Sequence, residues 1–262
     1  MILETYLEMM NDFENEDLVN SLETIVEIYS DSIEPFALQI CRKLSESYWR
    51  LMDMDEECDE GELGAMSCMS TIRTIFEAVH KNPELLVKLE KECFKVFAHC
   101  TTPDGMDSIE DVVACTCQIM HHANHISEEI WALAPQLLRV IVGADDEAEG
   151  GYGFEHLGST VDFFRNIIKL GEDQLWTRTI GEEPFIQVLV KAMIKCIGIT
   201  NEYQYCQSGS LAALLIAASI FENHNGKVDN YLLKFLKIGL EDLVKEGVSS
   251  YYARIICEFI FT

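Results

Sequence analysis

Cysteine and histidine are concentrated in one short stretch, ACTCQIMHHANH, which covers residues 114–125. Thiolate and imidazole are groups that bind structural zinc in proteins. In a helix, Cys117, His121 and His125 are spaced four residues apart and therefore follow one another along one side. The three residues are accordingly a candidate metal site.

The apolar residues around them favour a structural explanation. They form one coherent helical stripe: Ile109, Val112, Val113, Thr116, Ile119, Met120 and Ala123. Cys117 borders this stripe, His121 lies further round the helix and His125 is almost opposite, so the three side chains drift apart. The sequence offers no identified fourth ligand and no Cys-x-x-Cys pair. We therefore expect packing between helices and no cofactor, with the metal site as the alternative.

Motifs of covalent and phosphate chemistry are missing from the sequence. Nucleophilic catalysis needs an activated serine or cysteine beside a base. The chain has no Gly-x-Ser-x-Gly elbow, and most of its cysteines lie in apolar helical patterns such as LQICRKL and MIKCIGI. The run GGYG (150–153) lacks the Lys-Ser/Thr of a phosphate-binding loop. The sequence therefore predicts that the protein is not an enzyme.

Two acidic runs are the remaining candidates for a binding site, DMDEECDEGE (53–62) and GADDEAEGGYG (143–153). Their acids are Asp53, Asp55, Glu56, Glu57, Asp59, Glu60, Glu62, Asp145, Asp146, Glu147 and Glu149. Such clusters attract a partner rich in lysine and arginine, and salt weakens the attraction. The competing interpretation is that both runs are solvated linkers.

The charge of the whole chain limits its partners. Its 262 residues carry 45 acidic and 19 basic side chains, a formal net charge of −26. Nucleic acid and anionic membranes are poor partners, since binding there needs lysine and arginine. Residues 1–62 carry 18 acidic and 3 basic groups, whereas residues 182–262 carry 9 and 7. This imbalance indicates a localised surface for a basic protein, or an acidic end that serves solubility alone.

Three features bear on the location of the protein. The ten cysteines form no compact disulfide framework, so we expect reduced thiols in the cytosol or nucleus. The N-terminal MILETYLEMM lacks the basic start and apolar core of a signal peptide. The longest apolar stretch, residues 211–221, is too short to span a bilayer. We therefore expect a soluble protein without membrane insertion.

The elements that would carry these residues are helices with a regular spacing. Proline is scarce, with five in the chain, which favours long helices. Taken in pairs, the helices start near residues 17, 63, 108, 154, 204 and 248, at intervals of 46, 45, 46, 50 and 44. A period near 45 with two helices per unit is typical of HEAT or armadillo repeats. The sequence predicts an all-α HEAT-repeat solenoid.

The predicted solenoid is a single segment over residues 1–262 with about five helix pairs. The pairs cover approximately residues 17–52, 63–101, 108–142, 154–199 and 204–246, with partial repeats at 1–13 and 248–262. A repeat buries its apolar face only against its neighbours. An apolar end such as CEFIFT therefore indicates part of a longer superhelix.

Local signals mark several helix boundaries. The run NPE places Asn82 as a helix cap with Pro83 in the first position. Ser108, followed three residues later by an acid, has the form of a capping box. Ser127 is expected to cap the next helix, and Pro135 inside that helix predicts a kink.

One stretch carries a family resemblance. Residues 14–52, ENEDLVNSLETIVEIYSDSIEPFALQICRKLSESYWRLM, resemble the C-terminal half of importin-β-family (karyopherin) nuclear transport receptors, closest to the importin-seven and importin-eight type. The resemblance rests on ENEDL (14–18) and YSDSIEPFA (29–37), and IWALAP (130–135) is similar to a later helix of the same region.

The resemblance implies HEAT repeats that carry basic cargo, of the ribosomal-protein or histone type, through nuclear pores under control of the GTPase Ran. It implies shuttling between cytoplasm and nucleus, contacts with nucleoporins, and Ran binding through N-terminal repeats absent from this sequence. It also implies that cargo meets the second helix of each pair, near residues 33–52, 83–101, 127–142, 182–199 and 228–246. A family acidic loop joins two helices of one repeat, whereas the acidic runs here fall between pairs.

Two other interpretations stay open at this point. A HEAT-repeat scaffold subunit of another complex would share the fold and have no transport role. An enzyme or metalloprotein would be built around Cys117, His121 and His125.

Overall fold

The described part of the chain is built almost entirely of helices. A computed structural model describes residues 16–53, 60–143, 154–202, 207–224, 226–243 and 254. They fall into two compact units, Met1–Leu133 and Ala134–Thr262. The predicted all-α, HEAT-repeat class of fold is confirmed by the succession of helix pairs. Among the described helices, none has the length and apolar character needed to cross a membrane.

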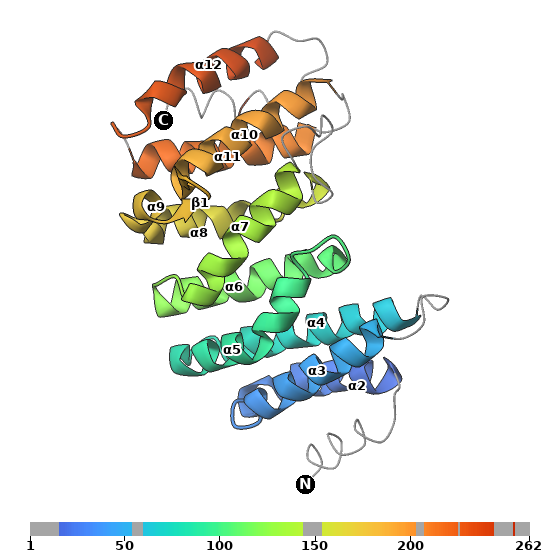
Figure 1. Cartoon of the computed structure of the whole chain (residues 1–262). Coiled ribbons are helices and arrows are strands. Elements are labelled where there is room, and N and C mark those ends of the chain that lie inside the picture. The colour runs from blue at the N-terminus through green and yellow to red at the C-terminus, as the bar shows by residue number, and fades with distance from the viewer. Residues whose placement is uncertain are drawn as a thin grey trace. The chain divides into compact units, whose positions relative to one another are not determined.

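Helices of the first unit alternate between two layers. Its elements are α2 (Glu16–Ile28), η1 (Ser30–Ser32), α3 (Ala37–Met52), α4 (Glu60–Ala78), α5 (Pro83–His99), η2 (Met106–Ser108), α6 (Ile109–Ala123) and the start of α7 (Glu128–Val142). Helix α2 packs on α4 and α4 on α6, while α3 packs on α5 (Figure 1). We call α2, α4 and α6 the first-helix row, and α3 and α5 the second-helix row.

Apolar residues at helical spacing explain why these layers form. Ile40, Leu44 and Tyr48 recur every four residues of α3 and are buried together. Between α4 and α5, the rings of Phe76 and Phe97 lie with their centroids 5.8 Å apart. Burying one such side chain contributes about 1.5–3 kcal/mol. A single helix cannot bury this stripe alone, so stability depends on stacking.

Two of the three predicted caps are confirmed. Asn82 Oδ1 accepts a hydrogen bond from the Leu85 N–H at 3.1 Å, with Pro83 in the first position of α5. Ser127 Oγ accepts one from the Ile130 N–H at 3.0 Å. The capping-box prediction at Ser108 is wrong, because its side chain makes no cap bond. There the 3₁₀ turn η2 leads directly into α6, and its tighter backbone bonds take the place of a side-chain cap.

The second unit has a less regular beginning. Its elements are the rest of α7, η3 (Phe154–Leu157), α8 (Val161–Gly171), α9 (Gln174–Thr177), β1 (Thr179–Ile180), β2 (Glu183–Pro184), α10 (Phe185–Glu202), α11 (Gln207–Asn223) and α12 (Asp229–Leu243). Helix α11 packs on both α8 and α10, and α10 contacts α12. The rings of Phe221 and Phe235 meet between α11 and α12 at 5.7 Å.

Sequence periodicity misplaced two boundaries in this unit. The predicted pair 154–199 opens with the turn η3 followed by α8, and its second helix, predicted from residue 182, begins later, at Phe185. The antiparallel pair β1–β2 precedes α10 and was not predicted. Gly181 makes its turn possible, since its φ of 62° is costly for other residues. Residues 1–13 of the predicted partial repeats lie outside the described residues, as do residues 248–262 apart from Arg254.

Candidate functional site

Acidic and basic residues are segregated in the first unit. The first-helix row carries nine acidic residues and one basic residue. The acids are Glu16, Asp17, Glu23, Glu27, Glu60, Glu62, Glu77, Glu110 and Asp111. The second-helix row carries six basic and four acidic residues. Most of the negative charge of this unit's helices therefore lies on the row formed by α2, α4 and α6, and Glu128 and Glu129 add two acids at the start of α7.

Arg73, the one base of that row, is held by its acidic neighbours. Its Nε lies 2.9 Å from Glu77 Oε1, and its Nη1 lies 3.1 Å from Asp111 Oδ1, which links α4 to α6. Partial burial raises the pKa of Asp111, although Arg73 opposes that shift. Glu23 also bridges helices, since it accepts a hydrogen bond from Ser70 Oγ at 2.8 Å. Glu27 is exposed to solvent and keeps its charge available to a partner.

A small pocket concentrates further acids beside this row. Glu62 of α4, Asp104 and Asp107 line it together with Met52 and Met66, and we call it the acidic notch. All three acids are exposed. The volume of the notch is about 20 Å³, which is room for one group of about the size of a water molecule. An ammonium head fits that size and charge, and the methionines offer apolar contact to its carbon chain.

Backbone geometry fixes the loop that supplies two of these acids. A Cβ on Gly105 would lie 2.6 Å from His99 Nδ1 and 2.7 Å from the His99 carbonyl oxygen. Only glycine lets the loop lie this close to the end of α5. The close approach places Asp104 and Asp107 against the start of α4.

The structure describes only part of the predicted acidic site. Asp53 is exposed just after α3. Glu60 and Glu62 lie in the first turn of α4, where negative charge is favourable, and not in a loop. The other predicted acids lie outside the described residues: Asp55, Glu56, Glu57, Asp59, Asp145, Asp146, Glu147 and Glu149. Sequence reasoning missed Asp104 and Asp107, because the run TTPDGMDS shows no charge cluster before it folds.

The candidate metal residues do not share one helix. Helix α6 ends at Ala123, because Asn124 takes a left-handed conformation with φ 53° and ψ 36°. The helix expected to carry Cys117, His121 and His125 therefore ends before His125, which lies beyond the row that begins at Cys117 and continues through His121. Within the described ranges, no group of three or more histidine, cysteine or acidic side chains is arranged to hold a metal ion.

Histidine rings in this region pack against one another. The His122 ring lies 4.8 Å from the His121 ring and 5.1 Å from the His80 ring, measured between centroids. Burial lowers the pKa of His122, and the two neighbouring histidines lower it further. The neutral ring of His122 is therefore favoured, as expected of a residue that packs α4 against α6.

The cysteines of the described part are buried thiols with one exception. Cys41, Cys68, Cys93, Cys100, Cys115 and Cys196 are buried, and Cys117 is half-buried. Burial raises the pKa of Cys68 and of Cys196 to about 12. A thiol with such a pKa is a poor nucleophile at neutral pH. These positions act as small apolar core residues.

The succession of packed helix pairs in each unit defines a helical-repeat protein. Over 97% of its length the chain is 28% identical to an importin beta-like SAD2 homolog of Arabidopsis thaliana. It is 23% identical over 90% of its length to a probable importin-7 homolog of Dictyostelium discoideum, and 22% identical over 98% to importin-8 of Mus musculus. These relatives confirm the predicted resemblance to importin-β-family transport receptors.

The similarity covers one part of each relative. The chain spans 24%, 21% and 24% of the lengths of these three proteins, respectively. No family model and no solved structure matches it.

Proposed function

We propose that this chain is the part of a nuclear transport receptor that binds basic protein cargo, by reversible association and without catalysis. The observation that carries the proposal is the charge of the first-helix row, nine acids against one base. Similarity to importins over nearly the whole chain supports it. In this proposal the complete receptor shuttles between cytoplasm and nucleus, contacts nucleoporins, and meets Ran through repeats outside this chain.

Binding would begin with long-range attraction and end with local contacts. A net charge of −26 raises the encounter rate with a lysine- and arginine-rich segment. Glu27 and the acidic notch would then hold individual cationic side chains. Exposed ion pairs are weak, about 0.2–1 kcal/mol each, so affinity comes from several of them together. Such an interface loads and releases cargo readily and weakens in salt.

The charge distribution argues for the first-helix row as the docking face of the first unit. The family resemblance implied the second helices instead. In the second-helix row the basic residues outnumber the acidic ones. In addition, the carboxylate of Glu92 accepts two hydrogen bonds from Arg42, with Nε–Oε1 at 2.9 Å and Nη2–Oε2 at 3.1 Å. A basic segment would therefore meet less favourable charge on α3 and α5 than on α2, α4 and α6.

The test compares two variants that remove equal charge from different units. Glu27→Gln, Glu62→Gln and Asp107→Asn change the proposed face, whereas Glu155→Gln, Asp162→Asn and Glu222→Gln change exposed acids of the second unit. A labelled lysine-rich histone-tail peptide is titrated against each, by fluorescence anisotropy at low and physiological salt. We expect the first variant to weaken binding about tenfold at low salt, the sum of three exposed ion pairs, and the control to bind like the parent chain. Equal losses in both variants would overturn the choice of face.

An experiment on the full-length receptor distinguishes a transport role from a scaffold role. Bound cargo that GTP-loaded Ran releases supports transport. Cargo that stays bound with Ran present, together with stoichiometric co-purification of a catalytic subunit, would show a scaffold instead.

A further inference from the structure

The second unit contains a groove with the opposite charge. It lies between α7 and α10 above the β1–β2 pair, and its volume is about 490 Å³, within the range of roughly 300–1,000 Å³ typical of ligand sites. The groove is lined by Leu138 and Arg139 of α7, Ile180 of β1, and Val188, Lys191 and Lys195 of α10. We call these six residues the basic groove.

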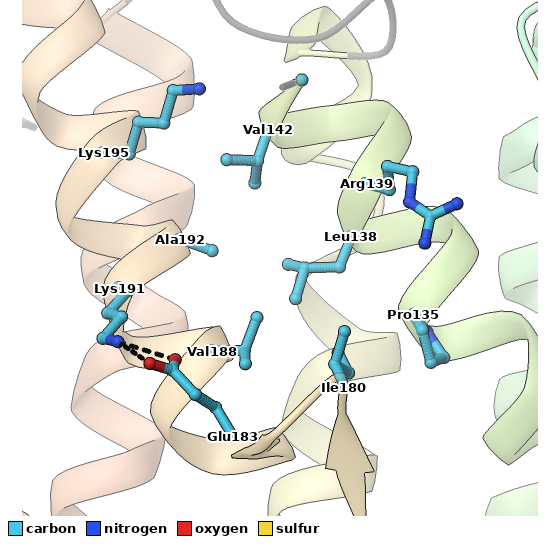
Figure 2. Close-up of a pocket in the computed structure, with 11 residues that line it drawn as sticks. Pro135, Leu138, Arg139, Val142, Ile180, Glu183, Val188, Lys191, Ala192 and Lys195 are labelled. Carbon is cyan, nitrogen blue, oxygen red and sulfur yellow. Dashed lines mark hydrogen bonds and ion pairs between the residues drawn. The ribbon is translucent and has the colours of Figure 1, made fainter. Parts of the chain in front are cut away.

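Cations border the groove from both helices. Figure 2 shows Lys191 and Lys195 on α10 and Arg139 on α7, with apolar side chains between the two helices. Among the described residues that line the groove, Glu183 is the one acid, and it accepts from Lys191 Nζ at 2.6 Å. Arg139 is exposed and makes no ion pair within the described part of the chain. Among the described residues that line it, the groove therefore has three cations and one acid, on a chain whose net charge is −26.

The floor of the groove is apolar and partly accessible. Ile180 and Val188 are half-buried, and Leu138 is buried. A floor of this kind gains free energy when an aliphatic side chain covers it. Cations at the borders and branched aliphatic residues between them are the complement of a segment that carries both carboxylates and aliphatic groups.

We propose that the basic groove binds a short protein segment in which acidic side chains alternate with aliphatic ones. The acidic side chains face Arg139 and Lys195, and an aliphatic side chain between them covers Ile180 and Val188. This partner differs in charge from the basic cargo of the first unit, so the two proposals can fail separately. A nucleic acid is not the favoured ligand, because three cations neutralise few phosphates and the acidic chain repels the rest.

The test uses the full chain and a labelled synthetic peptide in which glutamate alternates with leucine. A second peptide with lysine in place of glutamate controls for charge, and one with serine in place of leucine controls for the apolar contact. We expect the glutamate–leucine peptide alone to bind measurably, with affinity that falls as salt is raised.

Variants of the groove locate the binding site. Arg139→Gln and Lys195→Gln, made separately, should each weaken binding about two- to fivefold, as expected for single ion pairs near the surface. Val188→Glu, which places a like charge on the floor, should abolish binding. Arg165→Gln on α8 is the matched control, because it removes an exposed arginine that does not line the groove, and it should bind like the parent chain. Circular dichroism and thermal melting confirm that each variant is folded.

Several outcomes would overturn the proposal. One is equal binding of the lysine peptide, and another is no effect of Arg139→Gln and Lys195→Gln in folded protein. Displacement of the peptide by single-stranded RNA, lost in the same variants, would make the groove a nucleic-acid site. A dimer of the chain that Arg139→Gln dissociates in sedimentation would make it a contact between copies.

Discussion

Glu90 is a carboxyl group with an unusual environment in the first unit. It is 1% exposed and lies on α5, facing the start of α7. Its Oε1 accepts a hydrogen bond from Ser127 Oγ, the same hydroxyl that caps α7, while Oε2 has no partner. Burial raises the pKa of Glu90 from its usual 4.5 to about 7, and the Ser127 bond only partly opposes this. The folded protein therefore disfavours the ionised form.

Glu90→Gln should remove a pH-dependent loss of folding stability. With a folded pKa above the unfolded one, Glu90 destabilises the fold increasingly as pH rises from about 4.5 to about 7. A glutamine keeps an acceptor for Ser127 and carries no charge. We expect the variant to be more stable than the parent chain at pH 8, by up to about 3 kcal/mol, and to show no such gain near pH 4. Urea unfolding across this pH range measures the difference.

Glu92→Gln is the control on the same helix, because its pKa is shifted in the opposite direction. The hydrogen bond and charge of Arg42 lower the pKa of Glu92. Its ionised form stabilises the fold at neutral pH, and this contribution disappears as pH falls through its lowered pKa. Glu92→Gln should lose at most about 1 kcal/mol at pH 7. A stability gain for both variants at pH 8 would contradict the account of Glu90.

At the scale of elements, helix starts depend on single side chains. Asn82 caps α5 through Oδ1, and its Nδ2 donates to Glu34 Oε1 at 2.5 Å, close to the start of α3. The residue therefore serves two helices. Pro83 next to it has no N–H to satisfy, which suits the first helical position.

Asn82→Ala should lower the free energy of unfolding by about 1 kcal/mol, the usual value of a cap. Asn82→Ser separates the two contacts, since serine caps a helix but offers no amide to Glu34. We expect Asn82→Ser to retain most of the stability that Asn82→Ala loses, as measured by urea unfolding. Equal losses in both would assign the effect to the Glu34 contact instead of the cap.

The presence of helices could be predicted from the sequence more reliably than the residues at which they end. Buried positions spaced three or four residues apart predicted the helices around Ile40 and Phe97, since this period is set by the helix itself. The end of α6 at Asn124 and the turn at Gly181 depend on left-handed backbone conformations. Asparagine and glycine also occur in ordinary loops, so their presence in the sequence does not by itself mark a helix end or a turn of this kind. The acidic notch could not be predicted at all, because Glu62 and Asp104 meet only after α3, α4 and α5 are stacked.

At the scale of the molecule, acidic and basic residues are concentrated on different surfaces. Among the helices of the first unit, α2, α4 and α6 together carry nine acids and one base, while α3 and α5 carry more bases than acids. The second unit holds a groove bordered by Arg139, Lys191 and Lys195. Such segregation requires a fold with repeated faces, since each row presents the same side of successive helices. In the two proposals, each unit therefore selects a partner of a different charge.

A single chain should accordingly bind both kinds of segment at once. The proposed surfaces belong to different units and share no residues, so the two peptides have no contact residue in common. Because the two peptides contact different residues, saturation of one surface should leave the affinity at the other nearly unchanged at physiological salt, where long-range attraction is weakened. Two labels of different colour on the lysine-rich and the glutamate–leucine peptides allow both titrations in one sample. Mutual displacement at physiological salt, once direct binding between the two peptides is subtracted, would show instead that they compete for one surface.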